Sequence, residues 1–262
     1  MQGAAQAALD AGWESDWRAD GRLSRDDAAD VVLLPWPHSF RDGTLVVTPP
    51  HEGAAREAVL DRIPPCRLLV HGSGVTAEDV PQAGHALDPG RDEAFLRTNA
   101  ALTAEGALCR AMQRMERALL GSTCLITGYG RIGRALCARL CAMGAFVIVC
   151  ARNEGQMQAA HAAGAHPVPL AELTGAVGAA DLILNTVPAR VLGEEALRAV
   201  RPDALLIELA SAPYGEDLAV ARALGVRVEV ESGVPGRYAP LDAGAALFDA
   251  ALRRLKGEKC DG

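Results

Sequence analysis

Three glycines at a fixed spacing are the feature of this sequence most directly tied to a chemistry. Gly128, Gly130 and Gly133 follow an apolar run at 123–127 and precede a segment with helical apolar spacing. In that context the first glycine permits a tight turn, the second lets the backbone approach a pyrophosphate, and the third lets the helix pack on the strand. The phosphate would lie at a helix N-terminus, where free N–H groups bind anions. The predicted cofactor-binding residues are Gly128, Tyr129, Gly130, Arg131, Ile132 and Gly133.

The end of the next predicted strand, 146–150, indicates which dinucleotide binds. An NAD site usually has an acidic residue there that bonds the ribose hydroxyls, but this chain has Arg152 and Asn153. Because a guanidinium binds phosphate oxygens bidentately, these residues suit a ribose 2′-phosphate, and NADP(H) is favoured over NAD. The alternative is that Arg152 is a solvated strand-end residue and Glu154 contacts the ribose.

Three later segments carry polar or conformationally rigid residues after predicted strands, where ligands of open α/β sheets bind. They are 185–188, 210–215 and 232–240. Any one of them alone could be an ordinary strand-to-helix turn. From these segments we predict cofactor contacts by Asn185, Thr186, Pro188 and Pro235, a catalytic role for Ser211, and substrate contacts by Gly236 and Arg237.

A long helix is predicted over 99–120, and its spacing places Asn99, Thr103 and Gly106 on one face. Asn99, Thr103 and Glu105 are candidate catalytic residues, although Asn99 and Thr103 could instead cap the start of the helix. A glycine inside a helix costs about 1 kcal/mol relative to alanine, so Gly106 would permit close approach of a ligand or another helix.

Residues before this helix supply the remaining substrate candidates. Backbone N–H groups near Ser73 and Gly74 suit a carboxylate, as does the side chain of Arg97. The segments 35–38 and 48–50 also end predicted strands.

Several absences narrow the chemistry. The only lysines are Lys256 and Lys259, which argues against Schiff-base mechanisms and a lysine–aspartate dyad. No histidine follows Pro235-Gly236, where D-specific 2-hydroxy-acid dehydrogenases would place their acid/base group. Histidines and cysteines show no metal-ligand spacing, so no metal is expected, and the seven cysteines are interpreted as small core residues.

Charge and hydropathy restrict the partners. A net charge of −7 without a basic run argues against nucleic acid. No apolar stretch reaches the about 18 residues of a membrane span, and no signal peptide is recognisable. A cytoplasmic protein is expected.

The elements that must position these residues alternate between strand and helix. Strands are predicted at 123–127, 146–150, 181–187, 204–210 and 226–230, which indicates a doubly wound parallel sheet of the Rossmann type. Earlier strands at 31–34, 45–48 and 66–71, with a helix at 53–62, indicate a second, smaller α/β domain. The predicted organisation is 1–98 for the substrate-side domain, 99–120 for a bridging helix, 121–240 for the dinucleotide-binding domain, and 241–262 for a C-terminal helix that packs back across them.

In this order, the motifs make the chain resemble the A-type subunits of dipicolinate synthase. They are Asn99-Ala-Ala-Leu-Thr103-Ala-Glu105-Gly106, the loop 128–133, Ala151-Arg152, Asn185-Thr186-Val187-Pro188, Leu209-Ala210-Ser211-x-Pro213 with Asp217, and Val234-Pro235-Gly236-x-x-Ala239-Pro240. The resemblance implies NADP(H)-linked formation of pyridine-2,6-dicarboxylate from a dihydro or hydroxytetrahydro precursor of the lysine pathway. It also implies the flavoprotein-like B-type subunit of dipicolinate synthase as partner and a role in sporulation, in the mother-cell cytosol.

The chain departs from this family at two places. It begins inside what would be the first helix, so a strand and a Gly-Gly-Asp turn are missing, and the first domain is interpreted as N-terminally shortened. Loss of a central strand would leave its neighbours without ladder partners. Leu241 and Asp242 stand where the family has Lys and Thr, and Arg237 could replace the lost anion contact.

The expected reaction needs few acid/base groups. Removing a hydride from a dihydropyridine yields an aromatic ring, and a hydroxyl, carboxylate or water takes the proton. Two other functions remain open: a non-catalytic dinucleotide-binding scaffold for a flavoprotein partner, and a dehydrogenase of another small carboxylate. A homo-oligomer is also compatible with the sequence.

Overall fold

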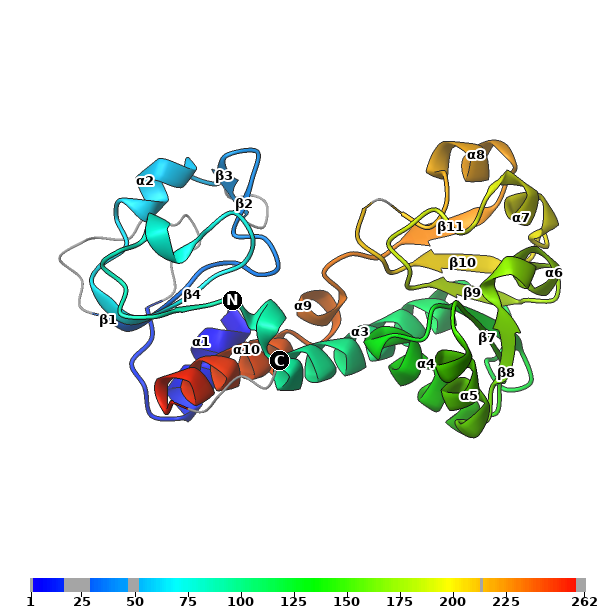
Figure 1. Ribbon diagram of the computed structural model, residues 1–262, viewed down its shortest axis with the longest axis horizontal. Helices are drawn as coiled ribbons and strands as arrows, with labels where there is room; N and C mark the ends of the chain where they lie inside the picture. The colour runs from blue at the N-terminus through cyan, green and yellow to red at the C-terminus, as the bar shows by residue number, and fades with distance from the viewer. Residues whose placement is uncertain (1, 17–28, 47–51, 213, 258–262) are drawn as a thin grey trace. The chain divides into compact units, whose positions relative to one another are not determined.

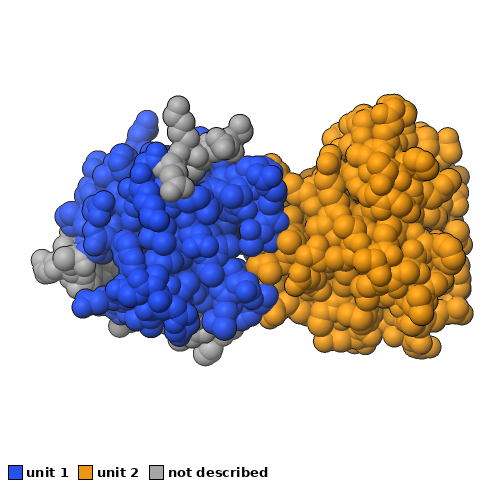
Figure 2. Space-filling model, turned by 90° about the horizontal axis from the view of Figure 1, so that it is seen from below, with its two compact units in different colours: residues 1–99, 239–262 blue, residues 100–238 orange. Residues whose placement is uncertain are grey.

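A computed structural model describes residues 2–16, 29–46, 52–212 and 214–257 (Figure 1). The predicted segment 48–50 lies outside these residues. The chain forms two compact units: residues 1–99 with 239–262 make up unit 1, and residues 100–238 make up unit 2 (Figure 2).

Unit 2 contains a six-stranded parallel sheet in the order β11-β10-β9-β6-β7-β8. The strand order reverses between β6 and β9, as in a doubly wound Rossmann sheet, so the predicted fold class is confirmed. The strands are β6 (Thr123–Thr127), β7 (Phe146–Ala151), β8 (His166–Pro169), β9 (Leu182–Asn185), β10 (Leu205–Glu208) and β11 (Arg227–Val230).

Helices cover both faces of this sheet (Figure 1). Successive strand residues point to opposite faces, so Cys124 and Ile126 pack in one buried cluster and Leu125 in another. Burial on both faces explains the continuous apolar runs that identified the strands. The helices are α4 (Arg131–Ala142), α5 (Glu154–Ala162), α6 (Leu173–Val177), α7 (Glu194–Ala199), α8 (Leu218–Ala223) and α9 (Val234–Tyr238).

Three strands of unit 2 differ from the prediction by more than one residue at an end. β9 ends at Asn185 and β10 at Glu208, earlier than the predicted 187 and 210, because both side chains bond the backbone of the following turns. β8 was not predicted, since Pro167 and Pro169 are atypical of strands. Its position at the sheet edge tolerates both prolines.

Unit 1 contains a three-stranded parallel sheet, β1-β4-β5, and a small β2–β3 hairpin. β1 and β4 pair directly, from Ala29↔Cys66 to Leu33↔Val70, so each of these strands has a ladder partner. The elements are α1 (Gln2–Asp10), β1 (Ala29–Leu33), β2 (Phe40–Arg41), β3 (Thr44–Leu45), α2 (Arg56–Leu60), β4 (Cys66–Val70), β5 (Ala86–Leu87) and α10 (Pro240–Leu255).

The C-terminal helix α10 belongs to unit 1, where it packs on α1 and β4. Gly3 and Gly244 allow the backbones of α1 and α10 to touch, because a Cβ on either glycine would overlap backbone atoms of the other segment. Trp13 packs edge-on against Phe248, with ring centroids 5.7 Å apart.

The long helix α3 (Glu93–Arg114) starts and ends earlier than the predicted 99–120. Asp92 precedes it, and its Oδ1 accepts a 2.8 Å hydrogen bond from Phe95 N, which stabilises a start at Glu93. Asn99 and Thr103 are therefore interior residues, and the capping interpretation is wrong. The boundary between the two units falls within α3, after Asn99.

Gly106 of α3 lies beneath α9. A Cβ at this position would overlap Val234 Cγ1 and lie 2.9 Å from Tyr238 Cδ2. The expected close approach is thus made by a helix.

We expect Gly106→Ala to lower the free energy of unfolding by about 1–3 kcal/mol, because the added methyl group overpacks the α3–α9 contact. Urea unfolding provides the measurement. Gly175→Ala is the matched control in unit 2, since it is also helical and a Cβ there meets nothing within 4 Å. The control should gain up to about 1 kcal/mol from helix propensity, and equal effects of the two substitutions would contradict the packing argument.

Candidate functional site

The glycine loop joins β6 to α4 and has the geometry of a phosphate cradle. Gly128 has φ +83°, and a Cβ there would lie 2.8 Å from Val187 Cγ2. Gly133 packs against the backbone of Gly128, where a Cβ would overlap the carbonyl oxygen. Neither position accepts a larger residue without displacing the loop.

Gly130 differs because the space around it is open. It is the exposed N-cap of α4, offers no side-chain cap, and a Cβ there would meet nothing within 4 Å. The N-terminus of α4 carries positive dipole charge and N–H groups without intrahelical acceptors. A pyrophosphate therefore fits the residues present.

The other loop side chains have structural contacts. Tyr129 is buried, and its hydroxyl donates to the carbonyl of Ala159 at 3.2 Å, while the guanidinium of Arg134 lies 5.2 Å from its ring centroid. Ile132 packs against the same core, whereas Arg131 is exposed. Tyr129 thus offers a ligand only its backbone.

Arg152 follows β7 and its side chain is exposed. Within the described residues it has no ion-pair or hydrogen-bond partner, so it is available to a ligand. Asn153 caps α5, with Oδ1 accepting from Gln156 N at 2.9 Å. Glu154, the alternative ribose contact, is exposed and accepts a 3.1 Å hydrogen bond from Gln158.

Asn185 was predicted to contact the cofactor, but its carboxamide is occupied within the protein. Nδ2 donates to both carboxylate oxygens of Glu208 at 2.8 and 2.7 Å and to Val187 O at 3.0 Å. Oδ1 accepts from the Thr127 hydroxyl and from Val187 N. The side chain therefore joins β6, β9 and β10.

Three further predicted residues lie at this edge of the sheet. The Thr186 hydroxyl donates to Thr127 O at 2.7 Å, which holds the turn against β6. Pro188 and Ser211 are both exposed, and a ligand can reach them.

Glu208 and Glu216 are buried residues of this edge that the sequence reasoning missed. Their relative exposures are 0% and 2%. Burial, followed by the neighbouring Glu208 carboxylate, raises the pKa of Glu216 to about 8. The sequence does carry a signal for Glu208, because this acidic residue directly follows the apolar run 204–207 and precedes a turn that contains Gly and Pro.

The three catalytic candidates on α3 lie in different environments. Glu105 is exposed and forms a 2.8 Å ion pair with Arg139 of α4. Thr103 is buried in unit 2, and Asn99 is half-buried in unit 1.

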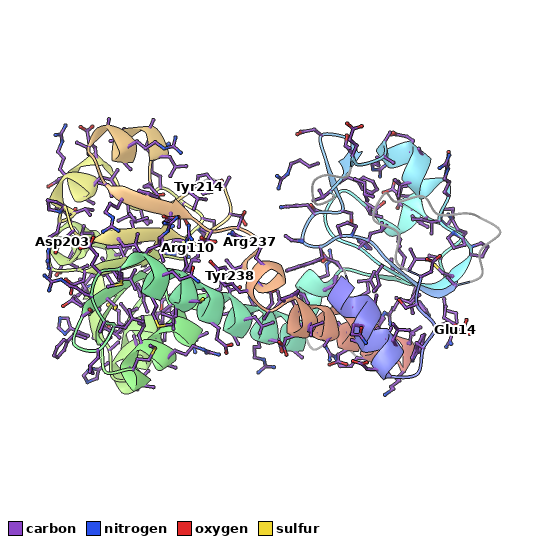
Figure 3. All side chains as sticks on the ribbon, turned by 180° about the vertical axis from the view of Figure 1, so that it is seen from behind. Glu14, Arg110, Asp203, Tyr214, Arg237 and Tyr238 are labelled. Carbon is purple, nitrogen blue, oxygen red and sulfur yellow. The ribbon has the colours of Figure 1, made fainter. Side chains whose placement is uncertain are left out.

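Arg237 was predicted to contact substrate, but it forms an ion pair within the protein. Figure 3 labels Arg237 together with Arg110 and Tyr238. It pairs with the buried carboxylate of Glu231 at 2.7 Å, and Arg110 pairs with the other oxygen of Glu231 at 2.9 Å. Arg237 also lies over the Tyr238 ring, at 5.7 Å from its centroid. Gly236 is exposed and Pro235 half-buried on the same short helix.

The candidates of unit 1 lie after β1 and β4. The Nδ1 atom of His38 is 2.6 Å from the hydroxyl of Ser73, and Gly72 N donates to the hydroxyl of Ser39 at 2.8 Å. Gly74, with φ +89°, accepts a 2.9 Å hydrogen bond from Arg56. Arg97 is exposed and lies 3.9 Å from Glu93.

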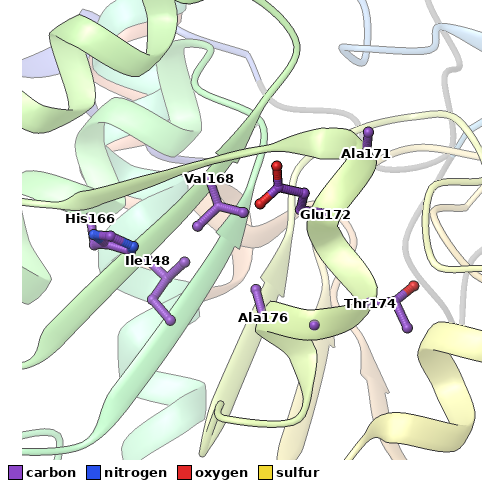
Figure 4. Close-up of a pocket in the computed structure, with 8 residues that line it drawn as sticks. Ile148, His166, Val168, Ala171, Glu172, Thr174 and Ala176 are labelled. Carbon is purple, nitrogen blue, oxygen red and sulfur yellow. The ribbon is translucent and has the colours of Figure 1, made fainter.

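A separate open hollow lies beside β7, β8 and α6 (Figure 4). It is lined by Ile148, His166, Val168, Ala171, Glu172, Thr174, Gly175 and Ala176. It includes none of the predicted site residues.

Metal-ligand clusters, membrane spans and reactive thiols were the other features of the described residues that could indicate a function. The described residues include no cluster of His, Cys, Asp or Glu that could hold a metal ion, and no helix long and apolar enough to cross a membrane. Burial raises the pKa of Cys124 and of Cys150 to about 12, which suits inert core thiols.

We expect Glu231→Gln to lower the free energy of unfolding by about 1–3 kcal/mol, since it leaves Arg110 and Arg237 without their shared carboxylate. Glu105→Gln is the control, because its exposed pair contributes at most about 1 kcal/mol. Urea unfolding of both variants makes the comparison, and losses of the same size would show that burial of Glu231 adds nothing.

Comparison with known proteins agrees with this geometry. Residues 94–227 match the NAD binding domain of the D-isomer specific 2-hydroxyacid dehydrogenases, a region that contains the glycine loop. The chain is 30% identical over 231 residues to the A-type subunit of dipicolinate synthase from Bacillus subtilis strain 168, covering 86% of this chain and 77% of that protein. The match supports a nicotinamide dinucleotide as cofactor and an oxidoreductase-type subunit.

Solved structures extend the similarity to the fold. The A-type subunit of dipicolinate synthase from Bacillus halodurans aligns with a TM-score of 0.76 at 25% identity, over 86% of this chain and 79% of that one. Its counterpart from Bacillus subtilis aligns with a TM-score of 0.74 at 27% identity, over 87% and 78%. The resemblance inferred from the motifs is confirmed: the chain belongs to the family of A-type dipicolinate synthase subunits.

Proposed function

We propose that this chain is the NADP(H)-binding subunit of an oxidoreductase that forms dipicolinate from a dihydro or hydroxytetrahydro precursor. The observation that carries the cofactor assignment is the exposed guanidinium of Arg152, which has no partner among the described residues and follows β7 at the sheet edge that holds the glycine loop. Its charge and fork of donors suit a ribose 2′-phosphate. No carboxylate competes for it among the described residues.

The residues present would hold the dinucleotide at three places. The backbone of 129–133 and the N-terminus of α4 would bind the pyrophosphate. Arg152 would bind the 2′-phosphate, and the turn 186–188 would border the nicotinamide side. When bound, the nicotinamide ring supplies a hydride acceptor.

The reaction balances with few protein groups. A dihydropyridine dicarboxylate loses one hydride and one proton to give the aromatic ring, and a hydroxytetrahydro precursor must first lose water. The exposed hydroxyl of Ser211 can orient a substrate or a water that takes the proton. Asn99 and Thr103 remain candidates for the same task, whereas Glu105 would have to leave Arg139 first.

The two carboxylate groups of the proposed substrate need cationic side chains or N–H donors to bind them. Ser73, Gly74, Gly236 and Arg237 remain the proposed substrate residues, and Arg237 can bind a carboxylate only by sharing its charge with Glu231. Because the similar proteins are named as one subunit of dipicolinate synthase, we also propose a partner, the flavoprotein-like B-type subunit. A cytoplasmic location and a role in sporulation are part of the same proposal.

We expect the protein to bind NADPH more tightly than NADH, and Arg152→Ala to weaken NADPH binding about 10- to 100-fold because a charge-assisted contact is worth about 1.5–3 kcal/mol. NADH binding should change little. Calorimetric titration with both nucleotides checks this, with Arg222→Ala as an exposed arginine control in the same unit. An equal loss for NADH and NADPH would contradict the 2′-phosphate assignment.

The same titration, repeated with dipicolinate, tests the substrate. Dipicolinate should bind to the NADPH complex, because both are products of the proposed reaction. Mixing NADP+ and precursor with the B-type subunit should give turnover, with the hydride of the precursor appearing in NADPH. Nucleotide binding without turnover under any of these conditions would favour a scaffold role over catalysis.

We also expect Gly130→Ala to lower NADPH affinity at least about tenfold while leaving thermal stability unchanged, since the methyl group fits the free protein but occupies the path of the pyrophosphate. Gly193→Ala is a closely matched control: Gly193 is likewise a helix N-cap with negative φ, no side-chain cap and nothing within 4 Å of a Cβ. Calorimetry and thermal melts of both variants separate binding from folding. Unchanged NADPH affinity in Gly130→Ala would contradict the placement of the pyrophosphate.

A further inference from the structure

Two acidic side chains are buried together at the carboxyl end of β10. Glu208 closes the strand, and Glu216 lies at the end of the following turn, just before α8. The described residues place no cation against either carboxyl group. Such a pair is costly if both members are ionised, so its hydrogen bonds decide its charge.

Glu208 has the contacts of a carboxylate. Its two oxygens accept hydrogen bonds from Asn185 Nδ2, from Ala210 N at 2.7 Å and from Gly215 N at 2.8 Å. All of these donors are neutral N–H groups, and in each of these contacts a Glu208 oxygen accepts. Glu208 is therefore an acceptor only.

Glu216 lacks such donors. Both of its carboxyl oxygens are buried, and neither accepts a hydrogen bond from a described residue. The charged group that faces it is Glu208 of β10. The next residue, Asp217, instead caps α8 and lies 3.5 Å from Arg190. A neutral Glu216 can donate its proton to Glu208, which removes one of the two buried charges and gives one of the two Glu216 oxygens a partner.

The pair is linked to the glycine loop through a short chain of contacts. Glu208 holds the amide of Asn185, which in turn bonds Val187 and Thr127. Val187 Cγ2 and Thr186 Oγ1 are the atoms that face the α-carbon of Gly128. On its other side, Glu208 accepts a hydrogen bond from Gly215 N at 2.8 Å, and the carbonyl oxygen of Gly215 accepts one from Leu192 N at 2.8 Å.

We propose that Glu208 and Glu216 share one proton. This proton keeps Asn185 and the 186–187 turn positioned against the glycine loop. The protein therefore binds nucleotide when the pair is protonated. Both glutamates act as positioning residues. The inference rests on the proposed function, because it assumes that the nucleotide binds at this edge of the sheet.

The pH dependence has a defined sign. The binding-competent form carries the proton, so the pair loses that form as pH rises above about 8. The Kd of wild-type protein for NADPH should be constant up to about pH 7, be roughly doubled near pH 8 and then rise, approaching tenfold per pH unit. Glu216→Gln keeps a neutral donor toward Glu208 and should give a flat profile with wild-type affinity at pH 7. Glu195→Gln, an exposed carboxylate of α7, should keep the wild-type profile.

Unfolding tests the shared proton without nucleotide. Between the ordinary pKa of 4.5 and about 8, folded wild-type protein retains a proton that the unfolded chain releases. Its unfolding equilibrium constant should therefore grow up to tenfold per pH unit relative to that of Glu216→Gln. An infrared carbonyl band of a protonated carboxyl group, present at pH 7 and lost above pH 9, reports the same proton in the wild type even if the variant does not fold.

These measurements separate the two ideas. Parallel NADPH profiles for wild type and Glu216→Gln, or no protonated carboxyl band at pH 7, would overturn the positioning proposal. If NADPH binds at no pH although the infrared band and the unfolding difference are present, the two glutamates do share a proton. In that case the nucleotide assignment is wrong, and so is the role of the proton in positioning a nucleotide site.

Discussion

The carboxyl edge of the unit 2 sheet depends on the buried carboxamide of Asn185. It donates to Glu208 of β10 and accepts from Thr127 of β6, so one side chain joins three adjacent strands where the strand order reverses. The reversal opens the crevice in which such sheets bind ligands. A buried amide stabilises this edge only while all its partners are present. Val187 bonds this amide directly, and Ala210 N and Gly215 N bond the carboxylate of Glu208 that the amide also contacts.

A second constraint is the tight packing made possible by glycines. Gly133 sets the distance between α4 and β6, Gly106 that between α3 and α9, and Gly3 with Gly244 that between α1 and α10. Close packing at these points leaves little freedom to the loops between them. Gly130 is different because a Cβ there would meet no described residue within 4 Å. Gly193 is equally open, so the place of Gly130 in the loop between β6 and α4 assigns it to ligand approach, and its openness alone does not.

Charge is distributed unevenly over the candidate site. Arg152 is exposed and unpaired within the described residues, whereas Arg237 and Arg110 share the buried carboxylate of Glu231. An unpaired guanidinium loses only hydration when an anion arrives, but a paired one must also share its existing carboxylate. The ribose phosphate contact is therefore the stronger assignment, and a substrate contact by Arg237 would be weaker than its charge suggests.

The sequence by itself determined the glycine loop, the parallel strands of unit 2 and the family, because strands buried on both faces leave continuous apolar runs and the loop requires glycine at fixed positions. It did not determine β8, whose prolines only an edge position tolerates, or the start of α3 at Glu93. Tertiary structure alone decided that Asn185 and Glu231 serve neighbouring protein groups, and that Glu208 meets Glu216. Side chains far apart in sequence acquire their partners only when the strands align, and those partners decide which polar groups remain for a ligand.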